Sequence, residues 1–148
     1  MVPMTEVEDR LQRALGTRVR QAEGAWRSYK LMKRFPYLIG SIDWKRARQV
    51  SERHAHEQPP ADSGHDPQHV VAFLDECSRK HNLTDEWVAF VGYSFDHEWE
   101  VERAALPELL ALVSDVADHK YIFALDASWC SMWSFRDELY FGFPPERD

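Results

Sequence analysis

The chain has 148 residues, of which 44% are hydrophobic and 29% charged, and its formal net charge is −7. This length fits one domain with a hydrophobic core that needs no disulfide or metal to hold it. No apolar run reaches the roughly 18 residues of a transmembrane helix. The acidic start MVPMTEVEDR also lacks the pattern of a signal peptide. We therefore expect a cytoplasmic domain that does not engage a membrane.

The charge is distributed unevenly along the chain. Residues 1–56 hold twelve Lys/Arg against six Asp/Glu, a balance of +6. Residues 57–148 hold six Lys/Arg against nineteen Asp/Glu, a balance of −13. Such asymmetry indicates either a charged partner or mutual attraction between the two halves of the chain, and the sequence leaves both interpretations open.

The N-terminal part is predicted to be helical. Apolar residues at helical spacing predict a helix over 4–15, and a second helix could lie within 17–35. We expect Asp43 to cap a third, basic amphipathic helix with the sequence WKRARQVSERH. The proline-containing segment 55–65 is a predicted loop inside one domain spanning 1–148, because about 55 residues alone would be marginally stable.

Strands dominate the remainder, after a helix that begins at Asp66-Pro67 and runs to about His81. A further helix opens at Pro107, and we predict strands at 86–93, 97–102, 120–125, 128–135 and 138–143, the last two forming a hairpin. This order predicts an α+β fold. Its mostly antiparallel sheet has about five strands with helices packed on one face, and its N-terminal part is helical.

The first candidate site is an acidic alternation around HEWEVE. On a strand, its carboxylates project from one face at intervals of roughly 7 Å. Such a face suits a basic partner surface and speeds encounter with it, although the like charges repel one another. The alternative is a solvated outer face that protects an edge strand from aggregation. The residues concerned are Asp96, Glu98, Glu100 and Glu102.

The predicted hairpin is the second candidate. Trp129 and Trp133 share a face if the strand is regular, and the opposite face is partly apolar too. This indicates either a central strand buried on both sides or an exposed aromatic patch. In the second case the two tryptophans bind a partner together with neighbouring acids, namely Asp126, Asp137 and Glu138.

Evidence for catalysis is weaker. Four histidines lie around the predicted loop and could hold a metal in a small hydrolase, which is the alternative function: His54, His56, His65 and His69. Cys130, His119 and Asp126 could be imagined as a nucleophile, its base and an orienting acid. The apolar neighbours of Cys130 favour burial instead, and we expect Cys77 and Cys130 to be reduced, buried thiols. We expect no enzyme activity and no cofactor.

The basic N-terminal stretch interleaves with aromatic residues, a pattern found in nucleic-acid-binding proteins. The stretch contains Arg18, Arg20, Arg27, Lys30, Lys33 and Arg34, with Trp26, Tyr29 and Phe35 between and beside them. The net charge of the whole protein opposes direct binding to nucleic acid, and no recognised binding motif is present. We therefore expect a protein partner rather than a nucleic acid.

The C-terminal stretch KYIFALDASWCSMWSFRDELYFGF resembles small bacterial immunity proteins of polymorphic-toxin and contact-dependent growth inhibition systems. In it a strand ends in an aspartate and is followed by a Trp-rich strand and an aromatic hairpin. The resemblance implies a protein that binds and blocks one cognate toxin domain inside the cell, often a nuclease, and it carries no catalytic residues over. Together with the acidic alternation, it predicts an inhibitor that recognises a basic toxin domain by acidic-surface complementarity.

Overall fold

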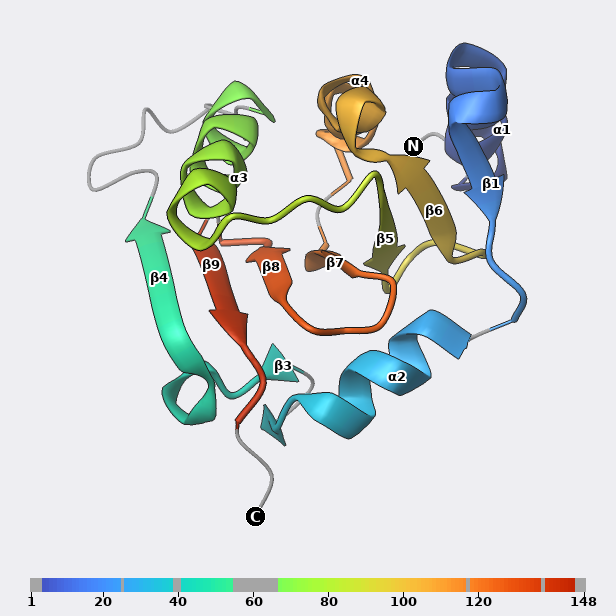
Figure 1. Cartoon of the computed structure of the whole chain (residues 1–148). Coiled ribbons are helices and arrows are strands. Elements are labelled where there is room, and N and C mark those ends of the chain that lie inside the picture. The colour runs from blue at the N-terminus through green and yellow to red at the C-terminus, as the bar shows by residue number, and fades with distance from the viewer. Residues whose placement is uncertain are drawn as a thin grey trace.

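The computed structural model describes residues 4–24, 26–38, 41–54, 67–116, 118–136 and 138–145. Its main sheet has seven antiparallel strands in the order β1-β6-β5-β7-β8-β9-β4 (Figure 1). They are β1 (Val19–Gln21), β4 (Arg48–His54), β5 (Trp87–Gly92), β6 (Trp99–Glu102), β7 (Lys120–Ala124), β8 (Cys130–Trp133) and β9 (Glu138–Phe143). A small second sheet pairs β2 (Tyr37–Leu38) with β3 (Ser41–Ile42). The predicted α+β class is confirmed, with more strands than expected.

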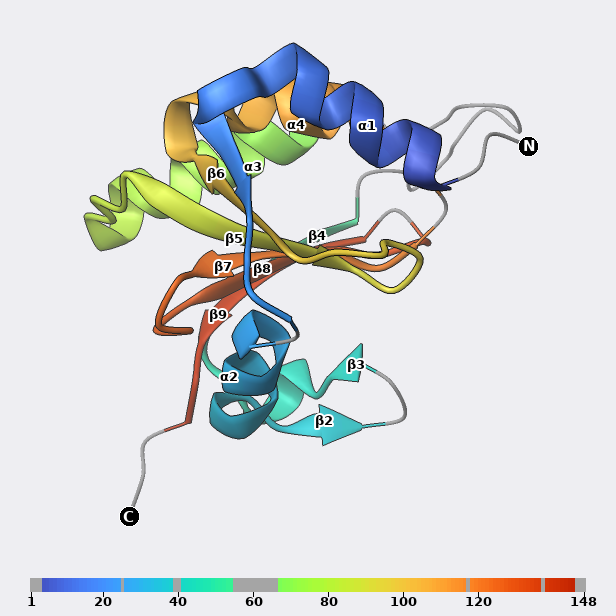
Figure 2. The same cartoon turned by 90° about the vertical axis from the view of Figure 1, so that its right-hand side faces the viewer.

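Helices cover both faces of the main sheet. On one face lie α1 (Met4–Leu15), α3 (Pro67–His81) and α4 (Leu106–Val113) (Figure 2). The other face is covered by α2 (Trp26–Arg34) and the small sheet, through Leu31 and Phe35. Three helices therefore share one face as expected, whereas α2 lies on the opposite one. None of the described helices is both long and apolar enough to cross a bilayer.

The predicted helix at 66–81 shows why the apolar pattern succeeds. Its residues Val70, Phe73, Leu74 and Cys77 are all buried against the sheet. This spacing places them on one stripe of a helix, so burial of that stripe stabilises α3. Asn82 then ends the helix with a positive φ of 54°, a conformation that asparagine tolerates better than most residues.

The hairpin of β8 and β9 lies inside the sheet. All residues of β7 and β8 are buried, Trp129 and Trp133 beneath the helical layer and Cys130 and Met132 on the α2 side. The interpretation as a central strand buried on both faces is therefore confirmed for β8. The turn that connects β8 to β9 leaves Phe135 half exposed.

The basic segment after Asp43 is a strand, so the predicted helix is wrong. Asp43 does accept a hydrogen bond from the backbone N of Lys45, but it caps only a single 3-10 turn, Trp44–Arg46. The chain then forms β4, which pairs with β9. Pairing with an open sheet edge, and the stacking of Trp44 on Tyr140, override the helical pattern of the segment. The predicted loop 55–65 lies outside the described residues.

Candidate functional site

The acidic alternation on β6 is mostly internal. Glu98 and Glu100 are only 8% and 6% exposed, so the expectation that they lie on an outer face is wrong. Glu98 accepts hydrogen bonds from the backbone N atoms of Arg27 and Ser28, at the start of α2. A carboxylate in this position satisfies the unpaired donors of a helix N-terminus and suits its dipole.

Glu100 is held by two arginines. Its carboxylate meets Arg20 Nε and Arg27 Nη2, each at 2.6 Å. Arg20 lies directly opposite Glu100 in the β1–β6 register, and Arg27 reaches it from α2. Burial alone would raise the pKa of Glu100, but the hydrogen bonds and charges of the arginines outweigh it and hold the pKa below its usual value. The mutual attraction of the two halves, left open by the sequence, is realised at this cluster.

A third buried carboxylate near β6 was not predicted from the sequence. Glu8 on α1 is 4% exposed and accepts hydrogen bonds from the backbone N atoms of Asp96 and His97 and from Trp99 Nε1. Asp96 itself is exposed at the turn before β6. The sequence did contain a signal for its burial. Glu8 follows Val7 and lies three residues before Leu11, so it falls on the apolar stripe of the predicted helix.

The acidic residues proposed around the hairpin do not form one surface. Asp126 is exposed, and its carboxylate accepts from Ser128 N within a turn. Glu138 is partly buried and meets the hydroxyls of Ser134 and Tyr140. Asp137 lies outside the described residues. Trp133 is buried beneath Lys120, whose Nζ lies 4.5 Å from the ring centroid, so it offers no contact to a partner.

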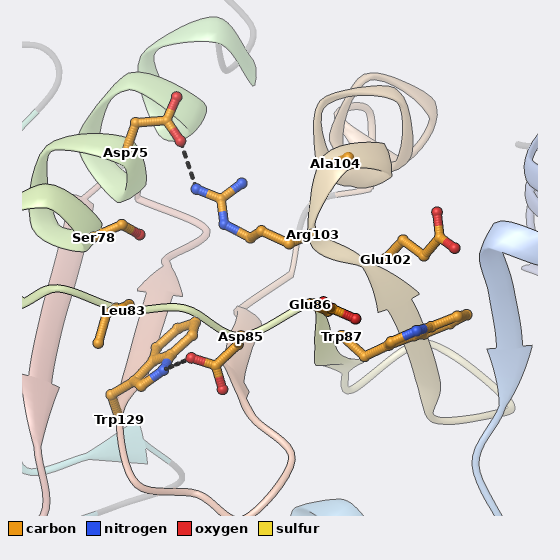
Figure 3. A pocket seen from close by; sticks show the side chains of 10 residues that line it. All are labelled: Asp75, Ser78, Leu83, Asp85, Glu86, Trp87, Glu102, Arg103, Ala104 and Trp129. Atoms are coloured by element: carbon orange, nitrogen blue, oxygen red, sulfur yellow. Dashed lines mark hydrogen bonds and ion pairs between the residues drawn. The ribbon is translucent and has the colours of Figure 1, made fainter.

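Two residues from the separate predictions, Glu102 and Trp129, meet at one cleft. It has a volume of about 590 Å³ and opens between α3, the 3-10 turn Arg103–Ala105 and the adjoining ends of β5 and β6 (Figure 3). We call it the acidic cleft, because four carboxylates line it beside a single cation, Arg103. The four are Asp75, Asp85, Glu86 and Glu102.

Two of these carboxylates are already engaged. Asp75 pairs with Arg103 Nη2 at 2.5 Å, and Asp85 accepts a hydrogen bond from Trp129 Nε1 at 2.9 Å, as the dashed lines in Figure 3 show. These bonds fix the α3 side of the cleft. They also keep Arg103 turned toward Asp75 and away from the glutamates.

The other two carboxylates are available. Within the described part of the chain, neither Glu86 nor Glu102 meets a hydrogen-bond donor or a cation at ion-pair distance through its side chain. Trp87 lines the cleft beside them (Figure 3), and Arg20 stacks on its ring 4.1 Å from the centroid. Two carboxylates beside an indole match a lysine or arginine side chain, whose stem is apolar and whose head is cationic.

The candidates for catalysis are not assembled. Cys77 and Cys130 are buried thiols, as expected, and burial raises the pKa of both. A thiol held neutral in this way is a poor nucleophile. The described residues contain no group of three potential metal ligands. His69 lies exposed on α3 and His54 ends β4, whereas His56 and His65 lie outside the described residues.

The outer side of α2 carries exposed aromatic residues. Trp26 and Tyr29 are about half exposed, and their stacked rings lie 6.1 Å apart. Lys30 and Lys33 lie over these rings at 5.6 and 4.9 Å. Of the predicted basic and aromatic stretch, Arg27 and Phe35 are thus directed inward, while these four side chains remain on the surface.

Comparison with protein-family models and with curated proteins found no match to the chain. The resemblance of residues 120–143 to immunity proteins therefore stays a prediction.

Proposed function

We propose that the chain is an immunity-type binding protein, and that its acidic cleft accepts a lysine or arginine side chain from a basic toxin domain. The observation that carries this proposal is the pair of carboxylates, Glu86 and Glu102, that line the cleft beside Trp87 without a partner at hydrogen-bond or ion-pair distance in the described part of the chain. Neither carboxylate meets a cation at ion-pair distance in the described part of the chain, so both can attract a cationic group of a partner.

The surroundings of the cleft favour a protein partner over a free metal ion. Trp87 supplies apolar surface beside the carboxylates, and tryptophan is enriched among residues that dominate binding energy at interfaces. A divalent metal would instead require oxygen ligands on several sides of the ion. The stem of a lysine or arginine uses both the indole surface and the carboxylates.

The identity proposed for the partner rests on two supports. One is the resemblance of the C-terminal strands to immunity proteins. The other is the net charge of −7, which favours rapid encounter with a basic domain such as a nuclease. The proposed inhibitor recognises that domain through charge and blocks it by occupying its surface, so that it needs no catalytic residue of its own.

Co-expression tests the biological part of the proposal. The proposal predicts a toxin domain encoded beside this gene; that domain should arrest growth of a host cell, and the intact chain should restore growth. The double variant Glu86→Gln/Glu102→Gln should restore it poorly. A matched control, Glu6→Gln/Asp115→Asn, removes two charges from exposed positions outside the cleft and should protect as well as the natural chain. Equal protection by both double variants would refute the assignment of the cleft.

Kinetics test the physical part. With the purified toxin domain, the association rate should fall steeply as salt rises from about 50 to 500 mM, because screening shortens the reach of surface charges. The cleft variant should weaken affinity by roughly 10- to 100-fold, the loss expected on removing charged hydrogen-bond partners at an interface. An affinity within about twofold of the control would show that the partner binds elsewhere.

A further inference from the structure

The layer that covers the α2 side of the main sheet is basic. Residues 26–46 include α2, the small sheet and the 3-10 turn Trp44–Arg46, and they hold six Lys/Arg against one acid, Asp43. Figure 2 shows α2 and the small sheet on the opposite side of the main sheet from α1, α3 and α4. The acidic cleft takes no lining residue from this layer. The net charge of −7 therefore conceals a local excess of cations.

Most cations of this layer are not paired within the fold. Arg27 is bound to Glu100, whereas the other five meet no carboxylate at ion-pair distance among the described residues. The rings of Phe35 and Trp44 lie 6.3 Å apart, so the end of α2 adjoins the 3-10 turn and the cations of both elements lie on adjoining surface. We call these five side chains the basic face: Lys30, Lys33, Arg34, Lys45 and Arg46.

Two exposed aromatic rings adjoin the basic face. Trp26 and Tyr29 are 54% and 49% exposed, and they line an open groove of about 730 Å³ at the start of α2. Lys30 and Lys33 lie on the same outer side of the helix, with their Nζ atoms over the indole and the phenol ring. Exposed rings that cluster in this way are typical of a binding surface rather than of scattered surface residues.

Single-stranded nucleic acid fits this combination of groups. Its phosphates pair with cations, and its bases have flat faces that stack on aromatic rings. A duplex hides the faces of its bases, so it would use the cations alone. A bilayer would need an apolar outer side on this segment, but Leu31 and Phe35 are buried against the sheet. Two acids adjoin the surface, Glu23 at the groove and Asp126 beside Arg34, and the five cations outnumber them.

We infer that the basic face, together with Trp26 and Tyr29, binds single-stranded nucleic acid. The lysines and arginines neutralise phosphates, and the two rings stack on bases. The expectation against nucleic acid rested on the net charge of the whole chain, whereas the structure separates the basic face from the acidic cleft. The inference does not depend on the proposed partner of the cleft.

Fluorescence anisotropy measures this binding with the full chain. The probes are labelled oligothymidine and oligouridine of about 20 nucleotides, longer than single-strand sites of about 4–16 nucleotides. Protein is added up to about 200 μM, because sequence-independent binding has dissociation constants of about 10⁻⁶–10⁻⁴ M. Saturable binding of either strand supports the inference, and the tighter one identifies the ligand as DNA or RNA. With about three to four phosphate contacts, affinity should fall roughly 20- to 50-fold between about 50 and 200 mM salt.

Two double variants separate the phosphate contacts from the base contacts. Lys33→Gln/Lys45→Gln removes two exposed cations. It should weaken binding and lower the slope of log affinity against log salt by about 1.4. Trp26→Ala/Tyr29→Ala should weaken binding by about tenfold or more and leave this slope unchanged, because stacking releases no counterions.

Matched controls test whether the binding is specific to this surface. Arg10→Gln/Arg13→Gln removes two exposed cations of α1, and Phe135→Ala removes an exposed ring outside the surface. Both should bind within about twofold of the natural chain. The inference is overturned if neither single strand binds saturably, or if the α1 control weakens binding as much as the loss of Lys33 and Lys45. It is also overturned if the loss of both rings has no effect.

Discussion

Replacement of Glu100 by glutamine should destabilise the fold by about 2–4 kcal/mol at pH 7. The carboxylate is 8% exposed and joins Arg20 of β1 and Arg27 of α2 to β6. Hydrogen bonds to charged groups contribute about 1.5–3 kcal/mol each, and breaking a buried pair costs about 3–5 kcal/mol. Arg20 is half exposed, so water screens its attraction to Glu100. The expected loss of stability is therefore smaller than the sum of these contributions.

The pH dependence has a definite sign. The pKa of Glu100 in the folded protein is held below its usual value of 4.5, so the folded state favours the ionised form. Its stabilising contribution is therefore complete above that value and is lost as the pH falls through the lower pKa of the folded state. The difference in stability between the natural chain and Glu100→Gln should shrink on acidification below pH 4.5.

Urea unfolding followed by tryptophan fluorescence measures this difference at several pH values. The control is Glu108→Gln, which removes an exposed carboxylate whose partner, Arg18, is also at the surface. The control should remain close to the natural chain at every pH, because exposed pairs are screened. Equal losses for the two variants at pH 7, or a loss for Glu100→Gln that does not change with pH, would refute the role assigned to the buried cluster.

Three further variants or reactions test other parts of the structure. The buried hydroxyl of Tyr121 has no hydrogen-bond partner in the described part of the chain, so Tyr121→Phe should raise the free energy of unfolding by about 1 kcal/mol in the same assay, and a decrease would show that the hydroxyl is paired. Cys77 and Cys130 should react with a thiol-specific reagent only after unfolding, because both thiols are buried and burial raises the pKa of both. A rapid change in the absorbance of the reagent with folded protein would contradict this. Gln49→Gly should stabilise the protein by roughly 0.5–1 kcal/mol, since Gln49 has a φ of 52°, and an unchanged melting temperature would count against strain there.

The sequence predicted those elements whose pattern is local. Apolar spacing identified α3 and α4, and alternation identified β6, because each pattern depends on residues within one turn or a few strand positions. It failed for β4, whose helical spacing was overridden by pairing with β9, a strand about 90 residues away in the register Arg53↔Leu139. Only the fold reveals that an edge is available to such a segment.

The same limit applies to the candidate site. Glu102 and Trp129 were selected for different reasons, one from the acidic alternation and the other from the hairpin. They meet in one cleft because α3, β6 and the approach to β8 converge beside the beginning of β5. Asp85 and Glu86 had no distinguishing pattern, since acidic residues are frequent throughout this half of the chain.

Strand β6 shows how the attraction between the two halves of the chain acts on the acidic alternation. Alternation directs Glu98, Glu100 and Glu102 to one side of the strand. The N-terminal segment reaches the first two with the start of α2 and with Arg20, and it neutralises them by capping and pairing. Glu102 lies beyond α2, and its carboxylate stays unpaired among the described residues. The coverage supplied by α2 therefore decides which of these carboxylates are paired within the fold and which stays unpaired among the described residues.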